Sequence, residues 1–171
     1  MQFIEGGVTA AKGFLAGGIH CGIRRNRSKR DLALIYSAVP ASAAAVYTSN
    51  LVKGAPLTVT KAHLADGKAQ AVICNSGNAN TCNADGVAVA EEMSALTAAQ
   101  LHIAPQDVIV ASTGVIGQPL DLTPIRSGLP QLAAALGDHS DQAAEGIMTT
   151  DTHPKEIAVQ FTAGGKTCTI G

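Results

Sequence analysis

Three short polar segments of the 171-residue sequence carry the side chains best suited to chemistry. They are Asn75 to Thr81, Ser112 to Gly117 and Thr149 to Thr152, and each follows an apolar run of strand or helix length. In layered α/β folds, the loops that follow such elements are common places for ligand binding and catalysis. These three segments are therefore the candidate functional sites.

The segment from Ser112 to Gly117 places a hydroxyl residue directly before a glycine. Thr113 can offer its hydroxyl and Gly114 its backbone N–H toward one point in space. Two such donors can hold the negative oxygen of a tetrahedral intermediate, and losing one typically costs about 3–4 kcal/mol of transition-state stabilisation. The alternative is a tight strand-to-loop turn in which Gly114 supplies only backbone freedom.

The other two segments also have a functional and a structural interpretation. The amides from Asn75 to Asn80 can form a polar cradle for a substrate, or a turn that hydrogen-bonds to itself. The run from Thr149 to Thr152 can bind a carboxylate or an amine, or cap the structure that follows. The residues alone leave these alternatives open.

No nucleophile with an evident base is recognisable, and no metal site is predicted. The sequence has no G-x-S-x-G elbow, no P-loop and no G-x-G-x-x-G dinucleotide motif. The histidines lack metal-ligand spacing, and we expect packing or surface roles for His20, His63, His102, His139 and His153. The cysteines form no CxxC pair, and we expect reduced, half-buried thiols at Cys21, Cys74, Cys82 and Cys168.

Composition excludes several classes of protein. The hydrophobic fraction is 46% and the charged fraction 15%, which excludes a disordered chain, because apolar burial can offset the entropy of folding. A net charge of −1 and 3% aromatic residues argue against nucleic-acid binding. No apolar run approaches the roughly 20 residues of a membrane span, and no signal-peptide pattern opens the sequence. We therefore expect a cytoplasmic protein without membrane attachment.

One cluster of positive charge stands out against the near-neutral total. It comprises Arg24, Arg25, Arg27, Lys29 and Arg30. Such a cluster can bind nucleic acid or another anionic partner, or it can be the solvated tip of a hairpin between two strands. Because the chain as a whole is not basic, we favour a hairpin tip over Gly18 to Asp31.

The elements that must position these segments are strands mixed with helices. Apolar or alternating runs predict strands over 31–39, 43–48, 56–61, 69–74 and 107–111, and a hairpin over 156–170. Helical patterns predict helices over 86–101, 124–136 and 141–148. This order indicates an α/β (α+β) fold, a layered sandwich of mixed sheets and helices in essentially one domain over residues 1–171.

The predicted helices come with further expectations. Asp85 is the expected N-cap of the helix over 86–101, with Val89, Met93 and Leu96 on its apolar stripe and Ser94 opposite. In the helix over 124–136, we expect Gly128 and Pro130 to separate a short turn from a longer helix.

The sequence stops at Gly171, directly after a predicted strand. Such an ending leaves a strand edge exposed unless another polypeptide continues the sheet. We therefore expect a continuation beyond this residue, and a chain that aggregates or folds only partly when it is expressed by itself.

The sequence also resembles a known family, the ornithine acetyltransferases, also called glutamate N-acetyltransferases, of arginine biosynthesis. The resemblance rests on motifs that follow one another through most of the chain: GGVTAAKGFLAGGIHCGI (6–23), DLALI (31–35), VPASAAAVYTSN (39–50), ICNSGNANTC (73–82), ASTGVIG (111–117) and IMTTDTHPKE (147–156). It implies a fold of the self-processing type with an N-terminal threonine nucleophile, completed by a second chain.

Members of this family are made as one precursor that cuts itself ahead of a threonine, giving an α chain and a β chain. The present chain resembles the α chain and ends short of the cleavage site. The nucleophilic threonine and one substrate-contacting lysine would then lie outside it. The resemblance further implies an α2β2 heterotetramer, with the last hairpin (about 156–171) continuing into the β chain.

The site residues of the family map onto this chain by motif. Thr113 and Gly114 match its oxyanion pair, and Thr149 matches a substrate-binding threonine, with Thr150 as the adjacent alternative. The implied reaction is a ping-pong transfer of acetyl from N-acetylornithine to glutamate through an acetyl ester of the β-chain threonine, whose α-amine can act as base. No cofactor is implied, although some members also use acetyl-coenzyme A as a co-substrate.

Two other hypotheses stand beside this one. A related self-processing amidohydrolase or aminopeptidase would share the nucleophile but release its product to water. A binding module would instead read anionic partners through the basic cluster, with a salt-dependent affinity for oligonucleotides.

Overall fold

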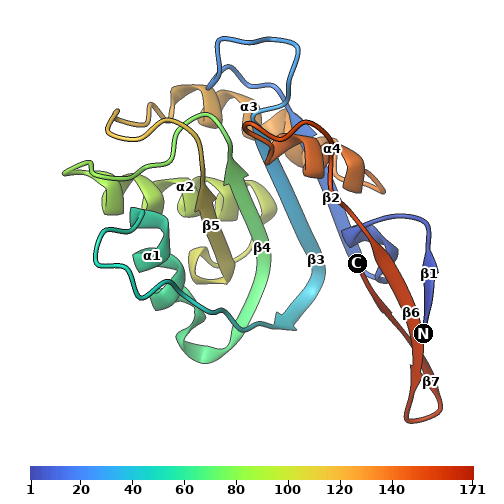
Figure 1. The fold of residues 1–171 in the computed structure, drawn as a ribbon. Coiled ribbons are helices and arrows are strands. Elements are labelled where there is room, and N and C mark those ends of the chain that lie inside the picture. The colour runs from blue at the N-terminus through green and yellow to red at the C-terminus, as the bar shows by residue number, and fades with distance from the viewer.

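A computed structural model describes residues 1–171 and contains two β-sheets, with helices packed around the larger one (Figure 1). The larger sheet has the strand order β2-β3-β4-β5, namely β2 (Phe14–Ile19), β3 (Leu32–Ser42), β4 (Lys68–Asn75) and β5 (Val108–Ser112). Strand β3 is antiparallel to both neighbours, whereas β4 and β5 are parallel. The smaller, antiparallel sheet has the order β1-β6-β7, namely β1 (Gln2–Ile4), β6 (Ala158–Ala163) and β7 (Lys166–Ile170).

Four α-helices and three short 3-10 helices connect the strands. The α-helices are α1 (Ala55–His63), α2 (Gly86–Leu101), α3 (Thr123–Ala134) and α4 (Ser140–Gly146). The 3-10 helices are η1 (Val8–Ala10), η2 (Leu64–Asp66) and η3 (Pro105–Asp107). None of the helices combines the length and the apolar character that crossing a membrane requires. The mixed, layered α/β architecture is the one predicted from the sequence.

Strand alternation gives the four-stranded sheet two unequal faces, because successive side chains point to opposite sides. One face packs against α1, α2 and α3 and forms the main core, which includes the fully buried Leu32, Leu34 and Ile73. On the opposite face, α4 covers β2 and β3 and forms a small cluster of Ala16, Ala33 and Ala143. The rest of that second face lines an open apolar cavity.

Helix α1 closes one edge of the four-stranded sheet, and the strand predicted over 56–61 is wrong. Helical spacing brings two polar side chains of α1 to the outer edge of β5. Thr60 Oγ1 donates to the carbonyl of Val110 (3.0 Å), and His63 Nδ1 donates to the carbonyl of Val108 (2.8 Å). A six-residue alternating pattern cannot distinguish a short strand from a helix, and this tertiary contact favours the helix.

The other edge of the same sheet, at β2, is also paired. Ala16 and Gly137 exchange two backbone hydrogen bonds of 2.9 and 3.1 Å. Both edges of the sheet therefore find partners within the chain, which reduces the number of open backbone groups through which strands pair with other molecules.

Strand β3 runs further than predicted, and the segment after it is not a strand. The pairing of β3 with β4 shifts between Tyr36 and Ala41, and Pro40 lies in this irregular stretch, where no N–H is needed. The strand predicted over 43–48 is wrong, because both neighbours of β3 are already in place and residues 43–54 find no partner strand.

Helix α2 has the predicted bounds but a wider buried face. Asp85 stands at the N-cap position, yet its side chain makes no capping hydrogen bond. Met93 is fully buried, and so is Ser94, which lies on the side opposite the apolar stripe. The helix contacts α1, α3 and β5, so it is enclosed on more than one side.

Helix α3 is continuous, so the predicted split at Gly128 and Pro130 is wrong. A side chain at Gly128 would lie 2.6 Å from the Cβ of Cys21, so the glycine permits a close approach between α3 and the end of β2. The hydrogen bond that Pro130 cannot make is offset by burial of large apolar side chains, Ile125, Leu129 and Leu132.

The remaining predicted elements are confirmed. Residues 69–74 lie in β4 and residues 108–111 in β5, and α4 occupies most of 141–148. The C-terminal hairpin consists of β6 and β7, joined by Gly164 and Gly165 at φ of +55° and +74°. Two successive positive φ angles characterise the tight turn whose twist suits a two-residue hairpin.

Candidate active site

Residues 75–80 contact both the polar segment that follows β5 and the end of α4, which precedes the third polar segment. Strands β4 and β5 are parallel, so the segments that follow them emerge at the same end of the sheet. The Thr113 N–H donates to the carbonyl of Asn75 (2.9 Å), which joins the first two segments. Ser76 Oγ donates to the carbonyl of Gly146 (2.6 Å) at the end of α4, which joins the first segment to the region just before Thr149.

The asparagine segment is a self-hydrogen-bonded turn. Asn75 is fully buried, and its Oδ1 accepts from the N–H groups of Gly77 (3.2 Å) and Asn78 (3.0 Å). Its Nδ2 donates to Ser112 Oγ (2.7 Å) in the neighbouring segment. Because the amide of Asn75 is used internally, the structure supports the turn interpretation and not the substrate cradle.

The two later asparagines are also used within the protein. Asn78 Oδ1 accepts from the N–H of Asn80 (2.7 Å), and Asn78 Nδ2 donates to the carbonyl of Gln118 (2.9 Å). Asn80 Nδ2 donates to the carbonyl of Gly86 at the start of α2 (2.8 Å). The segment is therefore a rigid support for its neighbours.

Gly114 occupies a position that only glycine fits. Its φ is +125°, and a Cβ there would lie 2.6 Å from the carbonyl carbon of Gly77. A Cβ at Gly77 would in turn lie 2.4 Å from Cγ2 of Ile23. Ile23, Gly77 and Gly114 thus form a close stack, and the Ile23 loop supports the backbone of Gly114 through Gly77.

Thr113 and Gly114 each retain a free hydrogen-bond donor. The Thr113 N–H is bound to Asn75, but within the chain no acceptor engages the Thr113 hydroxyl or the Gly114 N–H. The two donors belong to adjacent residues on a backbone held from both sides. This arrangement suits the binding of an oxyanion.

Thr113 lines a cavity of about 620 Å³ on the open face of the four-stranded sheet. The walls are mostly small apolar side chains of β3, β4 and β5, among them Ala33, Cys74 and Ala111. Lys155 and Glu156 supply the charged groups of the lining, and Gly171, next to the end of β7, also reaches it. An apolar wall lowers the local dielectric and strengthens hydrogen bonds to a developing charge.

Thr149 is half-buried, and it lies outside the cavity lining. Its N–H donates to Asp151 Oδ2 (3.2 Å), and Lys155 forms an ion pair with the same carboxylate. The hydrogen bond from Lys155, followed by the one from the Thr149 N–H, holds the pKa of Asp151 below its usual range. Thr150, the adjacent alternative, is exposed.

The cysteine of the cavity wall is not a ready nucleophile. Burial raises the pKa of the Cys74 thiol to about 11. Burial and the neighbouring Asp31 carboxylate raise the pKa of Cys21 to about 12. A thiol is reactive through its thiolate, so both side chains are inert near neutral pH. All four cysteines are free thiols, and of these Cys82 is exposed.

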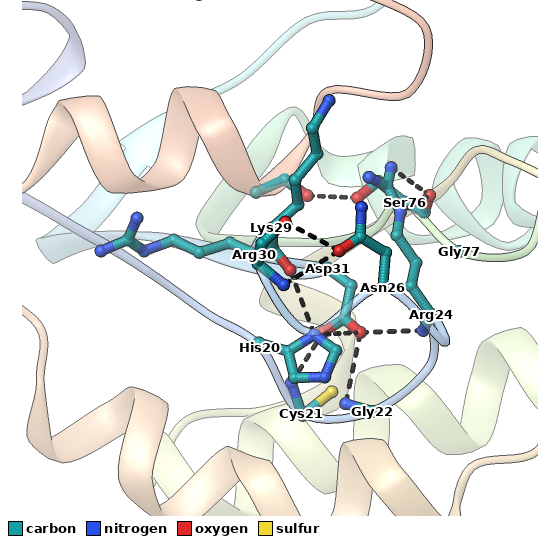
Figure 2. A network of polar contacts seen from close by, with 12 residues as sticks. His20, Cys21, Gly22, Arg24, Asn26, Lys29, Arg30, Asp31, Ser76 and Gly77 are labelled. Carbon is teal, nitrogen blue, oxygen red and sulfur yellow. Dashed lines mark hydrogen bonds and ion pairs between the residues drawn. The ribbon is translucent and has the colours of Figure 1, made fainter.

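The basic cluster lies in the connection between β2 and β3, as the hairpin prediction requires, but two of its five cations have partners inside the protein. Arg24 donates to the carbonyl of Ser76 (Figure 2) and to the carbonyl of Met148. Arg30 forms an ion pair with Glu145. The solvated tip is therefore limited to residues 25–29, and the charge available to an anionic partner is reduced.

Sequence reasoning missed the residues that organise this connection, Asp31 and Arg24. The only signal was an acidic residue at the start of a predicted strand, directly after a run of cations. The partners of Arg24 are backbone carbonyls and those of Asp31 are mostly backbone N–H groups, which no residue pattern identifies.

Comparison with known proteins places these motifs in a family. The sequence matches the ArgJ family over residues 15–171. It is 48% identical over 174 residues to the arginine biosynthesis bifunctional protein ArgJ of Symbiobacterium thermophilum, covering 100% of this chain and 43% of that protein. It is 49% identical over 173 residues to the protein of the same name from Gloeobacter violaceus, covering 99% and 42%. The chain thus spans about two-fifths of the length of these relatives.

Two crystal structures show the same fold. Arginine biosynthesis bifunctional protein argJ from Bacillus halodurans superposes with a TM-score of 0.92 at 44% identity, covering 99% of this chain and 90% of that chain. Ornithine acetyltransferase from Mycobacterium tuberculosis, complexed with ornithine, superposes with a TM-score of 0.86 at 36% identity, covering 92% and 86%. The resemblance drawn from the sequence motifs is confirmed.

Proposed function

Because the chain belongs to the ArgJ family, we propose that it supplies the oxyanion-binding part of an acyltransferase that moves an acetyl group from N-acetylornithine to glutamate in arginine biosynthesis. One observation carries this proposal. The Thr113 hydroxyl and the Gly114 N–H are adjacent, unengaged donors, and Thr113 lines an apolar cavity. The ornithine in the crystal structure of the Mycobacterium tuberculosis neighbour supports the identity of the leaving group.

The reaction proceeds in two half-reactions. A threonine hydroxyl from the remainder of the protein attacks the acetyl carbonyl of N-acetylornithine, and its proton passes to the α-amine of the same threonine. Collapse of the tetrahedral intermediate breaks the amide C–N bond, and ornithine leaves with that proton. The glutamate amine then attacks the acetyl-threonine ester, which yields N-acetylglutamate and the free hydroxyl.

Thr113 and Gly114 act in both half-reactions, because each passes through an oxyanion. The Asn75 carbonyl anchors the Thr113 N–H, and Gly77 fixes the backbone of Gly114 by close contact. Donors that are already fixed in place need no reorganisation when the negative charge develops. No step of this chemistry requires a metal or another cofactor, and acetyl-coenzyme A can replace N-acetylornithine as acetyl donor.

We assign the nucleophile to a β chain that covers the open apolar face of the four-stranded sheet. The curated relatives are more than twice as long as this chain, and the cavity beside Thr113 is lined by small apolar groups that a partner segment would bury. We propose pairing into an α2β2 assembly in the cytoplasm. In that assembly Thr149 binds the substrate, with its N–H bound to Asp151 and the Asp151 carboxylate paired with Lys155.

Replacement of Thr113 in the full-length protein tests the proposal. Thr113→Ala removes one oxyanion donor and should lower turnover by roughly 10²–10³. Thr113→Ser keeps the hydroxyl and is the matched control, from which we expect turnover close to wild type. Unchanged turnover of the alanine variant would reject the oxyanion role.

The choice between transfer and hydrolysis rests on the products. Incubation with N-acetylornithine and glutamate should give N-acetylglutamate and ornithine in equal amounts. Release of free acetate in place of N-acetylglutamate would favour the alternative, a self-processing amidohydrolase. N-terminal sequencing of the purified full-length protein should also find a second polypeptide that begins with threonine.

A further inference from the structure

We propose that Arg24 is a positioning residue that holds the segment beginning at Thr149 at a fixed distance from the oxyanion pair, Thr113 and Gly114. This inference rests on the proposed function, because it assigns Arg24 a part in substrate binding by that same site. Arg24 lies in the connection between β2 and β3, which is distant in the sequence from Thr113 and from Thr149. Its side chain makes no hydrogen bond to either threonine.

The first step is the folding of the connection around a buried carboxylate. Asp31 is fully buried at the start of β3, and its two oxygens accept three backbone N–H groups, from Cys21 (2.7 Å), Gly22 (3.2 Å) and Arg24 (2.9 Å). His20 Nδ1 lies 3.2 Å from the same carboxylate. Figure 2 shows these groups converging on Asp31. The backbone at residue 24 is therefore held in place before its side chain makes any contact.

The second step is the use of the guanidinium group as a bridge. Arg24 Nε donates to the carbonyl of Ser76 (2.7 Å), and one terminal nitrogen donates both to that carbonyl and to the carbonyl of Met148. A guanidinium is planar, permanently charged and equipped with donors only, so it can span two carbonyl oxygens in one geometry. A lysine ammonium lacks this planar fork.

At one end of the bridge, Ser76 leads directly into the support of the oxyanion pair. Its N–H donates to the carbonyl of Asp31 (2.9 Å), and its hydroxyl donates to the carbonyl of Gly146. The next residue, Gly77, is the one against which Gly114 packs. This end is held by several contacts besides Arg24.

At the other end, the Met148 carbonyl belongs to the peptide group that carries the Thr149 N–H. A hydrogen bond to this oxygen fixes the plane of the peptide and with it the direction in which Thr149 leaves α4. The N–H of the same peptide donates to Asp151 within the threonine segment, so Arg24 supplies the contact that ties this peptide to the loop of the oxyanion support. Loss of Arg24 should therefore release the threonine segment more than the Ser76 side.

Arg30 provides a matched control. Arg30 lies in the same connection as Arg24 and is likewise half-buried. Its Nε donates to the carbonyl of Gly18 (3.0 Å), and its guanidinium group forms an ion pair with Glu145. It therefore repeats the chemistry of Arg24, a cation bound to a backbone carbonyl, without reaching Ser76 or Met148.

The test compares Arg24→Ala, Arg24→Lys and Arg30→Ala in the full-length protein. For Arg24→Ala we expect the KM for N-acetylornithine to rise about tenfold or more while kcat falls by no more than about threefold, the pattern of lost substrate binding with the reaction step intact. Arg24→Lys should be intermediate, because one ammonium can satisfy only one of the carbonyls well. Arg30→Ala should leave KM within about twofold of wild type.

A merely structural role of Arg24 would lower the yield or the melting temperature and leave KM unchanged, and that outcome would overturn the proposal. Amide hydrogen exchange supplies a readout that does not depend on activity. Arg24→Ala should speed exchange in peptides that cover 147–152, whereas Arg30→Ala should not, and equal exchange in both variants would also overturn it. If the wild-type protein transfers no acetyl group, the proposed function fails, and the exchange comparison alone decides the positioning role.

Discussion

The two sheets of this chain differ in whether their edges find partners. The four-stranded sheet is closed at β5 by side chains of α1 and at β2 by backbone pairing with Gly137. In the three-stranded sheet, β1 and β7 are outer strands without a further partner strand. Apolar side chains there are exposed, with Phe3 72% and Ile170 57% accessible, whereas Leu34 in the larger sheet is fully buried.

This contrast shows that the number of strands does not determine whether the edges of a sheet find partners within the same chain. Two polar side chains of one short helix bind two carbonyl groups of β5, so the helix occupies that edge. The strands of the small sheet pair as regularly as those of the larger sheet, yet its faces and edges are largely exposed in this chain. We infer that the remainder of the full-length protein provides it.

The strongest test of the contrast compares matched truncations in the two sheets of the full-length protein. Leu34→Ala should lower the free energy of unfolding by about 2–5 kcal/mol, because it leaves a cavity in the main core. Ile170→Ala should cost about 1–3 kcal/mol if the small sheet is covered in the assembled protein. Denaturant titration measures both. A cost of Ile170→Ala within about 0.5 kcal/mol, typical of a surface site, would contradict the cover.

Replacing glycines separates backbone strain from crowding at the end of the larger sheet. Gly114→Ala should destabilise the protein by about 1–3 kcal/mol, because a Cβ would overlap the backbone of Gly77 and the φ is positive. Gly22→Ala shares the positive φ but meets no atom within 4 Å, so it is the matched control and should cost less. Thermal unfolding of the two variants measures the difference. Equal losses would show that Gly77 yields to the added methyl group.

The edge closure by α1 can be broken without changing the size of a side chain. Thr60→Val leaves the carbonyl of Val110 without its hydrogen bond and should cost about 1–3 kcal/mol, the penalty of a buried unsatisfied group. Thr58→Val, on the exposed side of the same helix, makes the same chemical change and should stay within about 0.5 kcal/mol. Denaturation midpoints of the two variants are the measurement. If Thr60→Val leaves the denaturation midpoint unchanged, the hydrogen bond at this edge contributes nothing to stability.

Thiol reactivity offers the mildest test. Because burial raises the pKa of Cys74 to about 11, its thiolate fraction at pH 8 is only about 10⁻³, and alkylation should be slow. Its labelling rate should rise about tenfold for each pH unit from 8 to 10, while the exposed Cys82 reacts first. Mass spectrometry of tryptic peptides follows each site. Rapid modification of Cys74 at pH 8 would contradict its burial in the cavity wall.

Sequence reasoning succeeded where a pattern is long or where a turn has strong signals. The sixteen residues of α2 repeat the helical period often enough to be assigned, and the paired glycines at 164–165 mark the hairpin. Residues 56–61 of α1 are too few to show a helical period. Their helical state depends on contacts with β5, which the sequence pattern does not reveal.

The candidate site shows the same division. Thr113 and Gly114 were assigned through their match to the family motif, because the residues alone left a tight turn as the alternative, and their role stays a prediction. The positions of Arg24 and Asp31 could not be predicted, since their partners are mostly backbone N–H and carbonyl groups, which nearly every residue possesses. The sequence showed the positive charge of the cluster, but not which groups its side chains contact.

The limits of the Asp31 network have a practical consequence for protein engineering. Residues 25–29 are exposed and stand outside the ring of N–H groups that Asp31 gathers from residues 21–24. An affinity handle or fluorescent reporter inserted between Arg27 and Ser28 should therefore be accommodated, whereas one inserted between Gly22 and Ile23 should prevent the fold from closing. A few residues separate a permissive insertion point from a forbidden one.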